Sequence, residues 1–208
     1  MKTLKYIFPI LKIKEPVILV GNSPSIKNNN NGKLIDKFKT IIRINDFKIK
    51  GFEKFVGKKT HIIVVNNSIY EKYKKSNKKI IVLDNSYKID PNTFKKKLNH
   101  HVIDHNAALF LRYKYGPFKN LLRTLNCSGT WLNLLYPKNL TTGTILILLL
   151  LENKINFKFL GIDLNYKNDV PQYFNKKEFN KIDGHSHNFF LEKKVLNQLI
   201  KDKKIFSL

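Results

Sequence analysis

Short runs rich in isoleucine, valine and leucine recur along the chain, and most of them stop at a small or polar residue. They lie at 17–20, 41–44, 61–65 and 79–83, and a further strand is expected at 157–160. A strand without polar alternation is buried on both faces, which is typical of a parallel sheet covered by helices on each side. This pattern constrains the fold more than any other feature of the chain.

Helical patterns alternate with these runs. We expect helices over 33–38, 68–75, 93–98, 120–125, 143–153 and 188–201, and the last carries apolar residues at helical spacing. The apolar run 145–151 is too short to cross a bilayer and indicates a buried helix. Alternating strands and helices predict an α/β fold, a Rossmann-like three-layer α/β/α sandwich with a mainly parallel sheet.

The length of 208 residues fits one domain. We expect a basic N-terminal segment over 1–15 and a single domain over 16–208. The stretch 100–136 is the least readable and is a candidate lid or acceptor-side insertion.

The formal net charge of +24, from 39 basic and 15 acidic residues, has three interpretations. They are nucleic-acid binding, attraction to anionic membranes or substrates, and a compositional bias toward lysine, asparagine and isoleucine. The lysines are scattered, and no array of arginines and aromatics resembles a nucleic-acid motif. We therefore favour the bias and expect no nucleic-acid partner, although a basic surface would attract anionic donors and membranes.

Cys127 is the only cysteine, so no intramolecular disulfide can form and a reducing cytosol is suitable. Lysines and a proline interrupt the apolar residues of the N-terminus, which is therefore not read as a signal peptide. We expect a cytoplasmic protein with peripheral contact at the inner face of the membrane. Homo-oligomers are compatible with this reading.

Polar residues follow the first two strands. Gly21, Asn22 and Ser23 come after the first, and Asn45 follows the second. Carboxyl ends of parallel strands meet at the edge where α/β folds bind ligands. A glycine permits close approach of the backbone, and an asparagine can both donate and accept. Taken alone, Gly-Asn-Ser is more often an ordinary turn, and the glycines of a dinucleotide fingerprint are absent.

Arg43 alternates with the isoleucines of the second run and shares a strand face with Asn45. It could be architectural, paired with Asp46 or Asp36.

Two further segments carry polar residues beside predicted elements. Thr141, Thr142 and Gly143 open the apolar helix, where hydroxyls cap free amides and leave donors for a carboxylate or phosphate. Plain capping is the alternative. After the strand at 157–160 the chain continues with the ligand candidates Gly161, Asp163, Tyr166 and Tyr173; loop tyrosines are more often packing residues.

His185 and His187 precede the last helix, which carries Glu192. An imidazole is the usual general base near neutral pH. His-x-His can also chelate a metal, but no third ligand stands at a recognised spacing. The other histidines, at 61, 100, 101 and 105, show no partner pattern.

Together these segments resemble the sialyltransferase superfamily. Val20 to Ser23, the Ile-Asp at 35–36, the Ile-Arg-x-Asn-Asp at 42–46 and the stretch from Lys50 to Thr60 are similar to the long sialylmotif of the animal-type family. Pro137 to Thr144 resembles its short motif, and His187 to Glu192 resembles its His-x4-Glu motif. Gly161-Ile162-Asp163 with two tyrosines, and Gly-His-Ser-x-Asn at 184–188, look like the bacterial lipooligosaccharide enzymes.

The resemblance implies a sialyltransferase-type variant of the glycosyltransferase A fold. It also implies an inverting, metal-independent transfer of sialic acid from CMP to a hydroxyl of a cell-surface glycan such as lipooligosaccharide, with no cofactor. Asn22 and Asn45 would contact the donor, and Thr141, Thr142 and Gly143 would receive its carboxylate and nucleotide. Tyr166 and Tyr173 would hold the departing phosphate. His187 is preferred as the base, whereas the bacterial pattern selects His185.

Three features depart from the family. The disulfide that joins its long and short motifs cannot form with one cysteine, the chain is shorter than animal members, and the segment between the motifs does not align. We expect a bacterial relative. The alternatives are a CMP-Kdo or other nonulosonic acid donor, a basic nucleic-acid- or nucleotide-binding protein without catalysis, and a non-catalytic relative that binds CMP.

Overall fold

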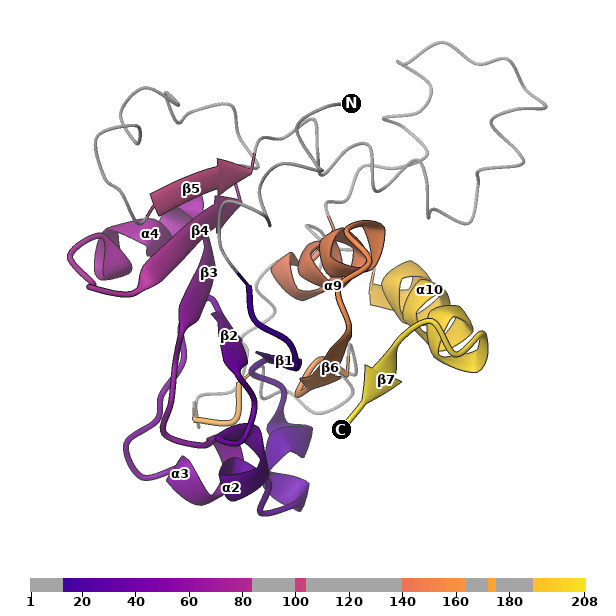
Figure 1. Ribbon diagram of the computed structural model, residues 1–208, viewed down its shortest axis with the longest axis horizontal. Coiled ribbons are helices and arrows are strands. Elements are labelled where there is room, and N and C mark those ends of the chain that lie inside the picture. Colours follow the sequence, from indigo (N-terminus) through magenta and orange to yellow (C-terminus); the bar gives the residue numbers. More distant parts are fainter. Residues whose placement is uncertain (1–12, 84–99, 104–139, 164–171, 175–188) are drawn as a thin grey trace, which may run out of the picture.

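The computed structural model describes residues 13–83, 100–103, 140–163, 172–174 and 189–208, with only the backbone described at 189–191. Its centre is a seven-stranded sheet in the order β5-β4-β3-β2-β1-β6-β7 (Figure 1), and every pairing in it is parallel. The strands are β1 (Val17–Val20), β2 (Thr40–Ile44), β3 (Ile62–Asn66), β4 (Lys79–Leu83), β5 (His100–Ile103), β6 (Phe157–Leu160) and β7 (Phe206–Ser207).

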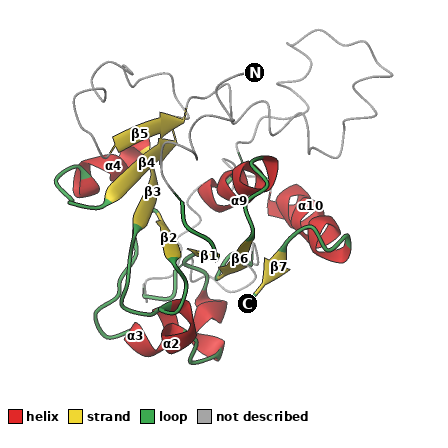
Figure 2. Cartoon of the chain, in the orientation of Figure 1, coloured by secondary structure: helices red, strands yellow, loops and turns green. Residues whose placement is uncertain are grey.

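Helices cover both faces of this sheet, as Figure 2 shows. The helical elements are η1 (Pro24–Asn28), α2 (Gly32–Ile35), α3 (Glu53–Val56), α4 (Asn67–Tyr73), α9 (Thr142–Glu152) and α10 (Phe189–Lys201). Helices α9 and α10 pack on the face that carries Val17 and Leu19. The short helices η1, α2 and α3 pack on the opposite face, which carries Ile18 and Val20, and α4 covers the same face over β3 and β4.

This architecture confirms the predicted α/β fold with a parallel sheet. Strand β1 shows the reason, because all four of its residues are buried. Alternate side chains of a strand point to opposite faces, so a strand that is apolar throughout needs a helical layer on each side. Helix α9 is also buried from Thr142 through Leu150, as its apolar run predicted. None of the helices in the described part of the chain is long and apolar enough to cross a membrane.

The structure corrects one prediction and sharpens others. Residues 100–103, expected to begin a lid, form the edge strand β5 and pair with β4. The helix predicted over 33–38 is limited to Gly32–Ile35, and α3 and β7 were not anticipated. The predicted helices 93–98 and 120–125, the rest of the candidate lid and most of the N-terminal segment lie outside the described residues.

The strand order places a topological switch point beside β1. From β1 the chain continues to β2 on one side, whereas β6, which follows β5 at the far edge, pairs with β1 on the other side. Loops that leave two such strands diverge, and ligands of open α/β folds bind in the crevice outside their carboxyl ends. Any site of this kind should therefore involve the residues just after β1, β2 and β6.

Candidate functional site

The loops after β1 and β6 lie directly against each other. The Gly21 amide donates to the Leu160 carbonyl at 2.8 Å and the Ser23 amide to the Gly161 carbonyl at 2.9 Å, while the Asp163 amide donates to the Ser23 hydroxyl at 3.3 Å. A Cβ on Gly21 would lie 2.2 Å from the Gly161 carbonyl oxygen, which no side chain tolerates. Gly21 is thus required for this contact, which forms the floor of the switch point.

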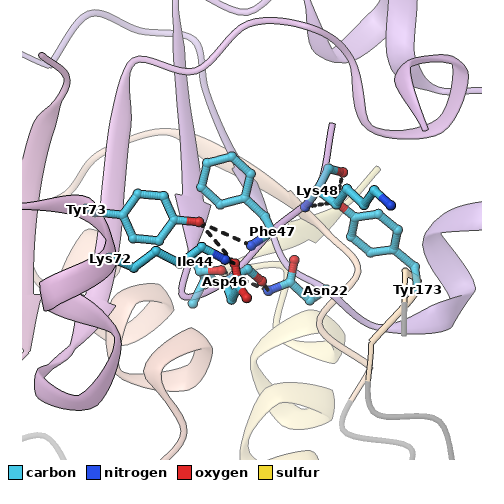
Figure 3. A network of polar contacts seen from close by, with 8 residues as sticks. All are labelled: Asn22, Ile44, Asp46, Phe47, Lys48, Lys72, Tyr73 and Tyr173. Carbon is cyan, nitrogen blue, oxygen red and sulfur yellow. Dashed lines mark hydrogen bonds and ion pairs between the residues drawn. The ribbon is translucent and has the colours of Figure 1, made fainter. Parts of the chain in front are cut away.

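Asn22 joins the loop after β1 to the loop after β2. Its Nδ2 donates to the carbonyl oxygens of Ile44 and Asp46, both at 2.8 Å (Figure 3). Its Oδ1 is buried and has no hydrogen-bond partner among the residues that the structure describes. A buried acceptor without a partner is costly. The amide therefore has one end fixed and one acceptor that a ligand can satisfy.

Asn45 connects three elements from the end of β2. Its backbone lies in the left-handed region at φ 50°, where asparagine is tolerated better than most residues. Its Nδ2 donates to the Thr142 hydroxyl at 3.3 Å, and its Oδ1 accepts from the Asn66 amide at 3.1 Å. Asn45 therefore links β2 to β3 and to the first turn of α9.

The start of α9 holds a buried carboxylate from α10. The side chain of Glu192 is 2% exposed and accepts from the Thr141 amide at 3.0 Å and from the Thr141 hydroxyl at 2.7 Å. The Thr144 hydroxyl donates to the same carboxylate. Thr141 also caps the helix, because its hydroxyl accepts from the Thr144 amide at 3.3 Å. The predicted capping by Thr141 is confirmed, whereas the binding of a ligand anion at this turn stays a prediction.

This contact changes the expected role of the Thr-Thr-Gly turn. Thr141 is already engaged with Glu192 in this structure. The Thr142 and Gly143 amides, which follow it, have no hydrogen-bond partner among the described residues. Free amides at a helix start carry partial positive charge and attract anions. A ligand carboxylate or phosphate would meet Thr142 and Gly143 rather than Thr141.

Arg43 is architectural, but its partners differ from those expected. The guanidinium is 1% exposed and donates to the Val56 carbonyl at 2.7 Å and to the Thr60 hydroxyl at 2.8 Å. No hydrogen bond joins it to Asp36 or Asp46; the carboxylate of Asp36 instead accepts backbone amides, and that of Asp46 binds a lysine. Burial lowers the pKa of Arg43 to about 10, so it stays charged at neutral pH.

Tyr173 lies in the core rather than at the mouth of a site. Its side chain is 3% exposed, and its ring meets that of Phe52 edge-on at 5.2 Å. Its hydroxyl accepts from the Lys48 amide at 3.1 Å and donates to the Lys48 carbonyl. The hydroxyl expected to hold a phosphate is thus bonded to the backbone. Tyr166, His185 and His187 lie outside the described residues.

The turn 45–48 gathers residues that sequence reasoning missed. The Lys72 ammonium and the Tyr73 hydroxyl both bond to the Asp46 carboxylate, and the Phe47 ring stacks on Tyr73 at 5.6 Å (Figure 3). No local pattern marks Lys72 or Tyr73, because their role depends on how α4 packs. Asn66 could have been noticed, since it ends a predicted strand and precedes a helix.

Two of the remaining histidines have structural partners. The His61 Nδ1 accepts from the Ile41 amide at 3.0 Å, and the His100 ring lies 3.0 Å from the Tyr70 hydroxyl. Burial, with nearby lysines, lowers the pKa of His61. Over the described ranges, no three His, Cys, Asp or Glu side chains are grouped so that they could hold a metal ion.

Two known proteins share short stretches of sequence with the chain. The beta-1,6-galactosyltransferase GALT29A of Arabidopsis thaliana is 47% identical over 51 residues, which is 24% of this chain and 13% of the relative. A CMP-N-acetylneuraminate-beta-1,4-galactoside alpha-2,3-sialyltransferase of Rattus norvegicus is 46% identical over 43 residues, which is 21% of this chain and 12% of the relative. Both matches thus span about an eighth of the relatives' lengths.

Solved structures show the same fold over most of the chain. A mammalian sialyltransferase in complex with Gal-beta-1-3GalNAc-ortho-nitrophenol superimposes with a TM-score of 0.62 at 17% identity, covering 92% of this chain and 68% of that one. The sialyltransferase CstII of Campylobacter jejuni, in complex with cytidine-5'-monophosphate, superimposes with a TM-score of 0.53 at 19% identity, covering 92% of this chain and 79% of that one. The family model for glycosyltransferase family 29 (sialyltransferase) matches residues 15–204. The chain therefore belongs to glycosyltransferase family 29, the sialyltransferase family.

Proposed function

We propose that the protein transfers sialic acid from CMP-sialic acid to a hydroxyl group of a cell-surface glycan such as lipooligosaccharide, with inversion and without a metal. The observation that carries this proposal is the family match over residues 15–204. We further propose that it works in the cytoplasm at the inner face of the membrane, where its net charge of +24 would favour anionic lipids.

The donor would lie at the edge formed by the carboxyl ends of β1, β2 and β6. The free Oδ1 of Asn22 would accept a hydrogen bond from a hydroxyl or amino group of the nucleotide. The Thr142 and Gly143 amides, at the positive end of α9, would bind the sugar carboxylate or the phosphate. A CMP donor leaves with one phosphate, so hydrogen bonds and helix ends can replace the metal that a diphosphate needs.

The reaction would be a single displacement. The acceptor oxygen forms a bond to the anomeric carbon while the bond from that carbon to the CMP phosphate oxygen breaks, and its electron pair leaves with CMP. His187, or else His185, takes the proton of the acceptor hydroxyl as general base. No covalent enzyme intermediate forms, so the anomeric centre inverts.

A second candidate is galactosyl transfer by the same site. Its support is the stretch that is 47% identical to a plant beta-1,6-galactosyltransferase. A neutral sugar brings no carboxylate to the α9 start, but its nucleotide carries two phosphates. A CMP-Kdo donor is a third candidate, because it shares the carboxylate and the single phosphate with CMP-sialic acid.

The test is donor hydrolysis and transfer with each sugar nucleotide in turn. The protein is incubated with CMP-sialic acid, CMP-Kdo or UDP-galactose, with and without EDTA, and nucleotide release is measured by chromatography. We expect CMP release from CMP-sialic acid that is unaffected by EDTA. This release should be lost in one of the two variants His187→Ala and His185→Ala, namely the one that removes the base. UDP release from UDP-galactose alone would favour the second candidate. A folded protein that releases nothing, or that is retained on DNA without binding CMP, would refute the enzymatic proposal.

A further inference from the structure

The turn 45–48 after β2 is held by two tyrosine hydroxyls that come from opposite sides (Figure 3). From α4, the Tyr73 hydroxyl accepts from the Phe47 amide at 3.5 Å and donates to the Asp46 carboxylate at 3.3 Å. From the segment 172–174, the Tyr173 hydroxyl accepts from the Lys48 amide at 3.1 Å and donates to the Lys48 carbonyl. Each phenol thus bonds to one backbone amide of the same turn.

Both hydroxyls are anchored by their rings. The Tyr73 ring stacks on the Phe47 ring with 5.6 Å between the ring centroids. The Tyr173 ring meets those of Phe52 and Phe174 edge-on, with centroid distances of 5.2 Å and 4.9 Å. Burial raises the pKa of Tyr73 to about 12 and also raises the pKa of Tyr173, so both phenols keep their protons at neutral pH. Each hydroxyl therefore offers a donor and an acceptor at a fixed place.

The turn in turn fixes the two asparagines at the sheet edge. The side-chain Nδ2 of Asn22 donates to the backbone carbonyls of Ile44 and Asp46, which lie on either side of Asn45 in the chain. Asn45 itself lies at φ 50°, in the left-handed region that asparagine adopts more readily than most residues, and its side chain bonds to Asn66 and Thr142. A turn that moved would reorient both side chains. The Tyr173 amide also donates to the Asn22 carbonyl at 2.9 Å, so Tyr173 contacts both loops.

We propose that Tyr73 and Tyr173 are positioning residues whose hydroxyls clamp the turn 45–48, and so set how Asn22 and Asn45 meet the sugar nucleotide. This inference rests on the proposed function, because it assumes that the donor binds at this edge. It assigns to Tyr173 an action through Lys48 instead of direct contact with the departing phosphate.

Tyrosine-to-phenylalanine variants remove each hydroxyl and keep each ring. We compare Tyr73→Phe and Tyr173→Phe with Tyr70→Phe, a control on the same helix whose hydroxyl contacts His100 instead of the turn. The measurements are CMP affinity by calorimetry, KM for the donor and kcat. Each variant loses the two hydrogen bonds of one hydroxyl, and only part of that loss reaches the donor site, so we expect either clamp variant to weaken CMP binding and raise KM about three- to tenfold. The control and all kcat values should stay within about twofold.

Amide hydrogen exchange gives a readout that does not depend on donor chemistry. Tyr73→Phe should accelerate exchange of the Phe47 amide, and Tyr173→Phe that of the Lys48 amide, by about three- to tenfold. If the wild type binds no CMP, the proposed function fails while this exchange result still tests the clamp. Two outcomes overturn the inference: a change in Tyr173→Phe alone, which would make Tyr173 a direct ligand, or unchanged exchange and affinity in both folded variants.

Discussion

Replacing Glu192 tests the contact that joins α10 to the start of α9. The Glu192 side chain is 2% exposed, and its carboxylate accepts the Thr141 amide, the Thr141 hydroxyl and the Thr144 hydroxyl. The same glutamate closes the His187 to Glu192 motif, so the contact links the helix that follows the proposed base to the helix that would bind the donor. We therefore expect the loss of this contact to lower the free energy of unfolding, whatever its effect on the rate of transfer.

The magnitude follows from the groups left behind. Glu192→Ala removes the acceptor from one amide and two hydroxyls, and a buried polar group without a partner costs about 1–3 kcal/mol. Part of this is offset, because the Thr141 hydroxyl can still donate to the Thr144 hydroxyl at 3.0 Å. Removing a buried carboxylate also removes its desolvation cost. We therefore expect a loss of about 2–4 kcal/mol for Glu192→Ala, and about 1–2 kcal/mol for Glu192→Gln, which keeps one acceptor oxygen but loses the charge.

Urea unfolding followed by circular dichroism measures these losses as a shift of the midpoint at constant slope. Asp202→Asn is the matched control, since its exposed carboxylate makes only surface contacts among the described residues, a hydrogen bond from Gln198 at 2.7 Å and an ion pair with Lys204 at 3.6 Å. It should cost less than about 0.5 kcal/mol. A double-mutant cycle of Glu192→Gln with Thr144→Val should show coupling of about 1 kcal/mol. A Glu192→Ala protein as stable as the control would refute the reasoning.

Three other perturbations have defined outcomes. Gly21→Ala would place a Cβ 2.2 Å from the Gly161 carbonyl oxygen and should lower the free energy of unfolding in urea by more than about 2 kcal/mol. Gly51→Ala, at φ +84° with open space around it, should lower it by about 1 kcal/mol, and equal losses in the two variants would contradict the close-contact argument. Asn45→Gly keeps the positive φ but removes two side-chain hydrogen bonds, so CMP affinity should fall by about tenfold in calorimetry while the fold survives; unchanged affinity would exclude Asn45 from the site. The pKa of His61 is lowered in the folded state, so the unfolded chain takes up a proton on this imidazole at a higher pH than the folded protein does. The stability of the wild type should therefore decline as the pH falls through and below 6.5. His61→Gln should weaken that decline, and the same pH profile in both proteins would contradict the prediction.

The sequence supports most of the fold. Continuous apolar strands such as Val17–Val20 and the run within α9 can be recognised because burial on all sides leaves no polar position. Strand β5 escaped notice, since its sequence His-His-Val-Ile begins with two polar residues and lies at the sheet edge. An edge strand is buried less completely, so its pattern is weaker.

The candidate site was likewise predictable in part. Asn22 and Asn45 could be placed at one edge of the sheet, because residues that follow parallel strands meet there. Which atoms they bond could not be predicted. The free Oδ1 of Asn22 depends on carbonyls that β2 brings beside β1. The clamp by Tyr73 depends on where α4 lies against the turn after β2.

The sequence by itself determined the type of the main elements, the parallel sheet and the edge that carries the polar residues, because these follow from local burial patterns and strand direction. Only the tertiary structure decided the partners: Glu192 for Thr141, the carbonyl of Val56 for Arg43, and the backbone of Lys48 for Tyr173. The physical reason is that buried polar groups must bond to whatever acceptors and donors packing brings near. Those neighbours come from segments far apart in the chain, so no local pattern contains them.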